Sequence, residues 1–248
     1  QPHKPTFLHK TFSRTAVDKN KLTRGYTTYI GWDVRGQHTL KQLMERRLTE
    51  VLKTKPDEII SWEKVFDEDQ LMTGRQSKYN YITERTFLRP RDIIQFSNEI
   101  VEQHKINLDR SEKIDNKEIN AAKTEYSRYF LDELDDEIHK HIPEYEKTLE
   151  VIKKIGYYQF DFKDFKITFD DKRSLFSNKA NEYEALKNLF EFSVIGFYRA
   201  GGSGYGGSEY IFRYKDNKAQ FDENAELFRV HLGLIETLGL KRSTKPKE

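Results

Sequence analysis

Apolar residues recur at helical spacing in several stretches of the chain. The clearest stretch begins at Pro90 and continues on one side of a 3.6-residue period with Ile93, Ile94, Phe96, Ile100 and Val101. Proline suits the first helical position, because the amide that it lacks would have no partner within the helix. Asp92 in the first turn suits the positive end of the helix dipole. We therefore expect an amphipathic helix over residues 89–103.

Further stretches show the same period. Residues 40–52 carry one apolar stripe, and the segment 111–150 is expected to form one long helix or two. Asp115 and Glu118 have the spacing of a capping box, and Gly156 stands where helices commonly end, after a stretch that starts at Glu144. The remaining helical predictions cover residues 57–66, 79–87, 181–195 and 225–238.

Extended segments are indicated by β-branched and aromatic residues and by alternation. Residues 5–12 and 26–32 are strand-like, and residues 160–169 alternate aromatic with polar positions before the pattern slips by one. Residues 196–200 and 209–214 flank a glycine-rich loop, which predicts a β-hairpin with Gly201–Gly207 at an exposed tip. Two strands near the start cannot bury both faces of a parallel sheet, so the missing strands are expected upstream or in another chain.

Composition narrows the class of protein. The 248 residues suffice for one large domain or for two to three small ones. The chain is polar, with a mean hydropathy of −0.86, yet its 17 Phe and 14 Tyr supply a core and favour a folded protein. A formal net charge of +2 argues against indiscriminate coating of nucleic acid.

The absence of cysteine and of targeting signals further limits the classes of protein to which the chain can belong. The chain has no cysteine, so it has no disulfide framework and no thiolate metal site. It shows no run long enough for a membrane span and no signal-peptide pattern, and we expect a cytoplasmic protein with no membrane contact. The first residue is Gln1 rather than Met, which indicates a piece of something longer.

Motifs for catalysis or metal binding are weak. A phosphate-binding loop needs lysine after its last glycine, whereas Ser208 and Glu209 follow Gly207 here. His139 and His141 are two residues apart and face different directions on a helix, which makes a poor metal pair. The acidic block at residues 132–137 is best interpreted as a solvated helix face. We predict no catalytic residue and no metal ligand within the chain.

Two arginines at the start of the helix at Pro90 are the strongest candidates for chemistry. Arg89 and Arg91 flank a helix N-terminus, where backbone amides favour anions and each guanidinium can fork onto a phosphate. The surrounding stretch, residues 86–98, resembles the lid-domain motif of bacterial P-loop ATPases of the AAA+/STAND type, including members linked to phage defence. The resemblance spans nearly the whole chain, but only as the C-terminal half of that family.

The resemblance implies a mostly α fold with α+β parts. Residues 1–56 would be the C-terminal part of an α/β ATPase core, and residues 57–110 a helical lid with the Arg-Pro-Arg-Asp motif. A connecting helix over residues 111–142 and a winged helix over residues 143–248 would follow.

Candidate nucleotide-sensing residues follow from the same resemblance. Arg91 would point at the phosphates, while Arg89 would either do the same or pair with an acidic group. Lys10 and Arg14 stand near the end of a strand that senses the γ-phosphate in the family, although members often have Arg-x-Asp where this chain has His-Lys-Thr. His231 is loosely similar to the His of a His-Asp motif that contacts ADP. Leu232 replaces the Asp, and a structural His is the alternative.

The implied function is to couple the ATP or ADP state of a longer protein to domain movement, oligomerisation or partner binding, with a role in antiviral defence. ATP and Mg²⁺ would be held mainly outside this chain, which lacks the Walker A and Walker B motifs, so whether it is part of an enzyme stays open. Partners would be the rest of the ATPase core, a second copy, and DNA or a protein bound by the winged helix.

The alternative is a stand-alone winged-helix protein that binds nucleic acid, and a third hypothesis is a protein-interaction scaffold. The basic face of such a winged helix would include Lys179, Lys187, Arg199 and Arg213. Interleaved carboxylates favour a domain that contacts protein instead.

Overall fold

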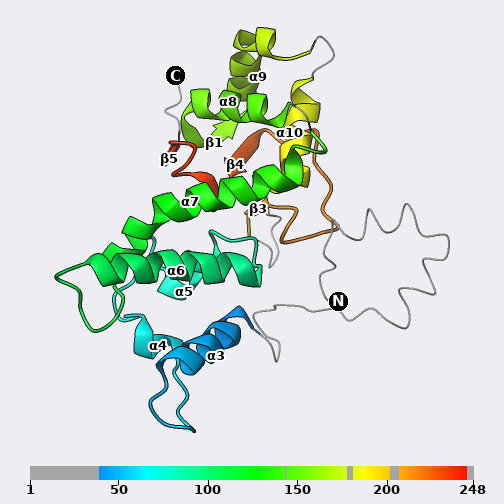
Figure 1. The fold of residues 1–248 in the computed structure, drawn as a ribbon. Coiled ribbons are helices and arrows are strands. Elements are labelled where there is room, and N and C mark those ends of the chain that lie inside the picture. Colours follow the sequence, from blue (N-terminus) through cyan, green and yellow to red (C-terminus); the bar gives the residue numbers. More distant parts are fainter. Residues whose placement is uncertain (1–38, 143, 178–180, 202–206, 245–248) are drawn as a thin grey trace.

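The computed structural model describes residues 39–142, 144–177, 181–201 and 207–244. Figure 1 shows a helical part, coloured blue to green, and a sheet that carries its own helices, coloured green to red. The first part contains α3 (Leu40–Leu52), α4 (Trp62–Val65), α5 (Lys78–Thr83), α6 (Pro90–Ile106) and α7 (Asn116–Ile138). The second part contains the helices α8 (Tyr145–Ile155), α9 (Phe162–Asp171), η1 (Arg173–Leu175), α10 (Glu182–Glu191) and η2 (Leu232–Leu234). Its strands are β1 (Tyr157–Asp161), β2 (Ile195–Arg199), β3 (Glu209–Ile211), β4 (Leu227–Val230) and β5 (Lys241–Thr244).

The two long helices begin as the sequence predicts. α6 has Pro90 in its first turn. α7 starts with the predicted capping box, in which the Asp115 carboxylate accepts from the Lys117 amide at 2.6 Å and Glu118 accepts from the Asp115 amide at 2.9 Å. Residues 111–150, where one long helix or two were expected, contain two helices, namely all of α7 and the first part of α8. α8 ends at Gly156, whose φ of 77° is left-handed and suits glycine.

Several predicted elements differ from the structure. The helix predicted over residues 57–66 is wrong for its first half, since helical structure starts only at Trp62. The preceding loop is closed by Glu58, which accepts from the Thr54 amide at 2.9 Å. The segment 79–87 is helical only as far as Thr83, and Leu88 then adopts a φ of 55°.

The extended segment predicted over residues 160–169 is wrong beyond Asp161. The Asp161 carboxylate accepts from the Asp164 amide at 2.7 Å and so starts α9. Phe165 and Phe169 in this helix are buried. Their spacing of four is helical, which explains the slip in the alternating pattern.

The helix predicted over residues 225–238 is wrong as well. Residues 227–230 are strand β4, in which Phe228 and Val230 are buried while Leu227 and Arg229 are partly exposed. This period of two is that of a strand with one face in the core. The short η2 helix follows within this segment, and strand β5 begins after it, at Lys241.

The five strands form one mixed sheet in the order β3-β2-β4-β1-β5. β2 and β3 pair antiparallel, so both strands of the predicted hairpin are confirmed, while most of its tip lies outside the described residues. β4 lies between β2 and β1 and pairs antiparallel with each, whereas β5 pairs parallel with β1. The described fold is therefore α+β and mostly helical, as expected.

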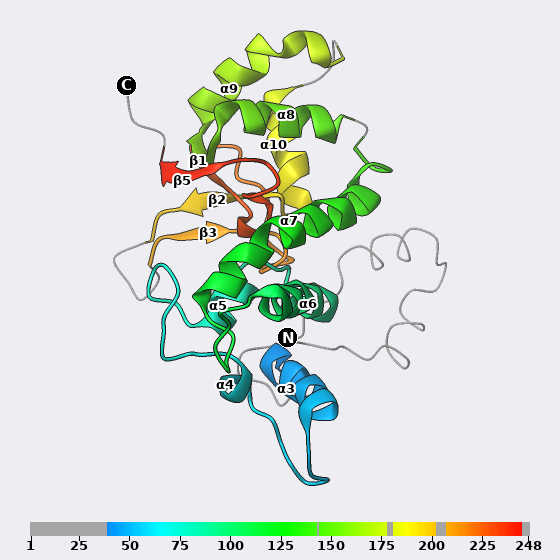
Figure 2. The same cartoon turned by 60° about the vertical axis from the view of Figure 1, so that its left-hand side comes forward.

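α7 joins the two parts of the fold. Figures 1 and 2 both show it between α6 and the sheet. On one side, the rings of Phe96 and Tyr126 stack with centroids 4.1 Å apart. One turn further along the same face, the Phe130 ring lies 5.1 Å from the ring of His231, which follows β4. One hydrophobic cluster runs through both parts, from Leu40 to Leu240.

The segment 1–56, expected to be the end of an ATPase core, is described by the structure only from residue 39 onward. The strands expected at residues 5–12 and 26–32 lie outside the described residues, and only the helix at the end of the segment 1–56 is seen, as α3. Within the described part of the chain, no helix combines the length and the apolar character that a bilayer crossing requires.

Candidate functional site

The start of α6 is held by the buried carboxylate of Asp92. This side chain accepts a hydrogen bond of 3.0 Å from the Phe87 amide and so fixes the turn before the helix. Asp92 is 1% exposed. Burial raises the pKa of Asp92, although the neighbouring Arg89 and the Phe87 amide favour its charged form. This hydrogen bond therefore fixes the backbone conformation at the start of α6, where Arg89 and Arg91 are located.

Both candidate arginines are bound to α7. Arg89 makes a forked contact with Glu137, with N–O distances of 2.6 and 3.2 Å. Arg91 lies 2.5 Å from a carboxylate oxygen of Glu133 and 3.1 Å from one of Glu137. The alternative in which Arg89 pairs with an acidic group is thus what the structure shows. We call these four residues the α6–α7 clamp.

The clamp is electrostatically satisfied. Burial acts to lower the pKa of Arg89, but the hydrogen bonds and charge of Glu137 outweigh it, and the pKa is raised. Counting Asp92, two guanidinium groups face three carboxylates. An anion such as a phosphate would have to displace Glu137 or Glu133 to reach the arginines. The arrangement can hold α6 and α7 together, or it can bind another anion in place of a glutamate side chain.

The structure brings His231 close to this clamp through Phe87. The Arg89 guanidinium lies 5.1 Å from the Phe87 ring centroid, and the His231 ring lies 4.8 Å from it on the way to the sheet. Lys10 and Arg14, predicted at the same nucleotide site, lie outside the described residues.

His231 itself is enclosed. It is 1% exposed, and Nδ1 accepts from the Gly233 amide at 3.2 Å. Burial lowers the pKa of His231 to about 3, with help from nearby cations, so the imidazole is neutral near neutral pH. The rings that surround it belong to Phe87, Phe130, Phe212 and Tyr214. This is the environment of a structural histidine, and contact with a nucleotide would require these rings to move.

Three of the four residues predicted to form a basic face have an acidic neighbour. Lys187 lies 3.6 Å from Glu184, and Arg199 lies 2.9 Å from Glu209. Arg213 lies 3.5 Å from a carboxylate oxygen of Glu191. Lys179 lies outside the described residues. These pairs lower the charge available to a nucleic-acid backbone.

Glu133 and Glu137 are the functional partners that sequence reasoning missed. The sequence predicts a solvated face for the acidic block, yet these two glutamates bind the arginines of another helix. Their spacing of four residues on one face of α7 was the available signal. It did not identify a partner 46 or 48 residues away.

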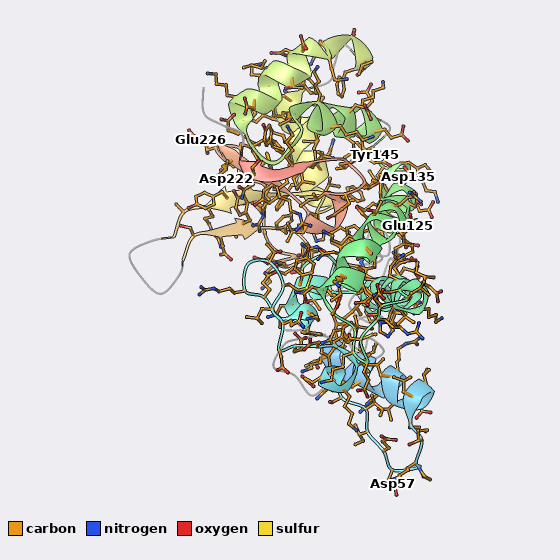
Figure 3. The ribbon with its side chains drawn as sticks, turned by 90° about the vertical axis from the view of Figure 1, so that its left-hand side faces the viewer. Asp57, Glu125, Asp135, Tyr145, Asp222 and Glu226 are labelled. Carbon is orange, nitrogen blue, oxygen red and sulfur yellow. The ribbon has the colours of Figure 1, made fainter. Side chains whose placement is uncertain are left out.

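An open pocket of about 460 Å³ lies between α7 and α8, where it is lined by two other members of this acidic block, Asp132 and Asp135. The Tyr145 hydroxyl donates to Asp135 there, and Figure 3 shows the two side chains together. Burial, followed by this carboxylate, raises the pKa of Tyr145. Within the described residues, no group of three or more His, Asp or Glu side chains could hold a metal ion. The lining residues are Leu131, Asp132, Asp135, Tyr145, Glu146, Lys147, Leu149, Glu150, Lys153 and Leu175.

Comparison with known families gives one match. Residues 38–135, less than half of the chain, are similar to a family described as the FunZ-associated C-terminal helical domain. The matched range contains α3 to α6 and all but the end of α7, and it is helical in the structure. No curated protein and no solved structure matches the chain. By its description the matched family is a helical C-terminal domain, and the similarity gives no support for an AAA+/STAND ATPase.

Proposed function

We propose that this chain is the accessory C-terminal part of a larger protein, and that the start of α6 responds there to a nucleotide held by the rest of the protein. ATP and Mg²⁺ would be bound mainly by that remainder. The α6–α7 clamp carries the proposal, because it places two arginines at a helix N-terminus against carboxylates that another anion can replace.

Exchange at the clamp would change how α6 is fastened to α7. A phosphate group that binds Arg91 competes with Glu133 and Glu137 for the same donors. If these glutamates are released, the C-terminal end of α7 is no longer held by the arginines before and in α6. Other residues of α7 contact the segment that follows β4 and η2. Ser127 of α7 accepts from the Thr237 amide at 3.0 Å, and Lys123 lies 3.5 Å from Glu236. A change between ATP and ADP would in this way alter the contacts of α7, and with them the surface that binds a partner or a second copy.

The test uses the complete protein that contains this chain. Arg91→Ala should depress ATP turnover far more than it lowers thermal stability, because the arginine is half exposed. Arg91→Lys should not rescue turnover, since lysine lacks the planar fork. Arg128→Ala is the matched control, because Arg128 also lies in this helical part and pairs with one glutamate, Glu125. Unchanged turnover in Arg91→Ala would leave Arg91 as a surface ion pair.

Nucleic-acid binding by a winged helix is the second candidate. The order α8, β1, α9, α10, β2, β3 follows the winged-helix plan, with the glycine-rich loop between the last two strands. The insertion of β4 between β1 and β2 departs from the simple plan. A duplex titration would favour this candidate if Lys187→Ala weakened a tight and salt-sensitive complex.

A further inference from the structure

The sheet has two chemically different faces. One face packs against helices, as Phe160 of β1 meets Phe165 of α9 and Phe197 of β2 meets Phe190 of α10. Figures 1 and 2 show α8, α9 and α10 together on this side of the strands. Side chains alternate along a strand, so the intervening residues point to the other face.

The other face carries tyrosines and an arginine. Tyr198 and Tyr210 are directly opposite each other on β2 and β3, with ring centroids 5.5 Å apart. Arg229 of β4 lies with its guanidinium 4.1 Å from the Tyr210 ring centroid. Gln159 of β1 is opposite Arg229 and donates to the Tyr210 hydroxyl at 3.1 Å. We call these four residues the tyrosine face.

The tyrosine face is partly open to solvent. Tyr198 is 37% exposed, and the other three residues are half-buried. Tyr210 is held in place by Gln159 and Arg229, so its ring is rigid while one side of the cluster stays accessible. Rigid aromatic rings lose little conformational entropy when a planar partner stacks on them.

Arg229 is the unusual member of the face. Within the described residues its guanidinium has no carboxylate partner and no side-chain hydrogen bond, and its Nε is buried without a partner. Its contacts are the rings of Tyr210 and Phe212, at 4.1 and 5.8 Å. Other arginines near the sheet, such as Arg199 and Arg242, each lie within 3.0 Å of a glutamate oxygen. The uncompensated positive charge of Arg229 favours an anionic ligand.

A second cation–aromatic pair extends the face along the sheet. Lys241 of β5 is opposite Tyr157 of β1 in the parallel ladder, and its ammonium lies 5.5 Å from that ring centroid. Lys241 is exposed. Tyrosines and cations therefore follow one another from β3 to β5, across all five strands.

We propose that the tyrosine face binds single-stranded nucleic acid. Unpaired bases would stack on Tyr198 and Tyr210, while Arg229 and Lys241 contact the phosphates. Stacking needs splayed bases, which a duplex does not offer, so a single strand is the ligand that fits aromatic rings on a sheet. The proposal is independent of the nucleotide response at α6, because no residue is shared between the two sites.

The experiment measures fluorescence anisotropy of a labelled oligothymidylate of roughly a dozen nucleotides. The complete protein should bind it more tightly than a duplex of equal length, and binding should weaken as salt rises. Tyr198→Ala should weaken binding by about 5- to 100-fold, the range expected when stacking on one base is lost. Arg229→Ala should also weaken binding and should reduce its salt dependence, because a phosphate contact is lost. Tyr198→Phe keeps the ring and should bind like the wild type.

Matched controls separate this face from the winged-helix alternative. Arg199→Ala removes a cation from the same strand as Tyr198, but one that already pairs with Glu209, and it should bind normally. Thermal melts check that each variant is folded, and the exposed ring of Tyr198 makes its loss tolerable. The proposal is overturned if the oligothymidylate does not bind at low salt, if the duplex binds better, or if folded Tyr198→Ala and Arg229→Ala bind as the wild type does.

Discussion

Tyr126 of α7 donates a hydrogen bond of 3.0 Å to the backbone carbonyl of Arg85, and Gly233 of η2 packs directly against the same carbonyl. Three segments distant in sequence thereby meet at one oxygen atom. A Cβ added to Gly233 would lie 2.9 Å from the Phe130 ring and closer still to the carbonyl. The helical part and the sheet therefore pack together only because residue 233 has no side chain.

Gly233→Ala should destabilise the protein by about 1–3 kcal/mol, the usual effect of overpacking a filled core. The cause is steric, because the obstructing atoms belong to backbone and to a buried ring. Chemical denaturation followed by circular dichroism measures the change. Gly207→Ala is the control, since a Cβ at Gly207 would meet nothing within 4 Å. Equal stability of both variants would contradict the tight contact.

The Arg89–Glu137 pair should show measurable coupling. A double-mutant cycle with Arg89→Ala and Glu137→Ala is expected to give about 0.5–1 kcal/mol, because the contact is forked but partly exposed. High salt should reduce the coupling. The Arg128–Glu125 pair is more exposed on both sides and should give about zero. A coupling near zero for Arg89–Glu137 would mean that this pair contributes nothing to stability.

The local features of this fold were predictable from the sequence. α6 and α7 follow from Pro90, from the capping box at Asp115 and from apolar spacing, all of which act within a few residues. The hairpin of β2 and β3 is local as well. Fold class and these elements could therefore be predicted without any knowledge of distant contacts.

The remaining features depend on contacts between distant residues. The alternation of Phe228 and Val230 covers only four residues, which is too short to distinguish a strand from a helix. The strand form of β4 depends on its pairing with β1 and β2 on either side. Likewise, the candidate arginines were found by their motif, but their partners on α7 were not. An ion pair between helices leaves no periodic signal in the sequence.

Glu118 should stabilise the protein above acidic pH. Burial acts to raise its pKa, but hydrogen bonds from the Asp115 amide and the Asn107 side chain, at 2.9 and 2.8 Å, outweigh it and the pKa is lowered. A lowered pKa in the folded state means stability that is present above the unfolded value and is lost as pH falls through the folded value. Glu118→Gln should therefore cost about 1–2 kcal/mol at neutral pH.

The same variant should also lose less stability than the wild type when the pH is lowered below about 4.5, since it has no charge to neutralise. Denaturation curves at neutral and acidic pH measure both effects. Glu112→Gln is the control, because Glu112 is exposed on the loop before α7. Identical behaviour of the two variants would mean that Glu118 is not held in its charged form.

His231 should make the folded state sensitive to mild acid. Its pKa is lowered to about 3 in the folded protein by burial, whereas an unfolded histidine titrates near pH 6.5. Between these two pH values His231 binds a proton in the unfolded state and stays neutral in the folded state. Stability contributed by the neutral ring is therefore complete above about pH 6.5 and is lost as pH falls, by up to about 1.4 kcal/mol per pH unit.

His231→Asn removes the titrating group while its side-chain oxygen can still accept from the Gly233 amide. The variant should be less stable at neutral pH, because a smaller side chain leaves space among the surrounding rings. Its stability should fall less steeply than that of the wild type between about pH 6.5 and 5. His139→Asn, which changes an exposed histidine and leaves His231 intact, should keep the wild-type steepness. If the wild type and His231→Asn lose stability in parallel over this range, the ring at position 231 accepts its proton while folded, and the enclosed neutral imidazole described above is wrong.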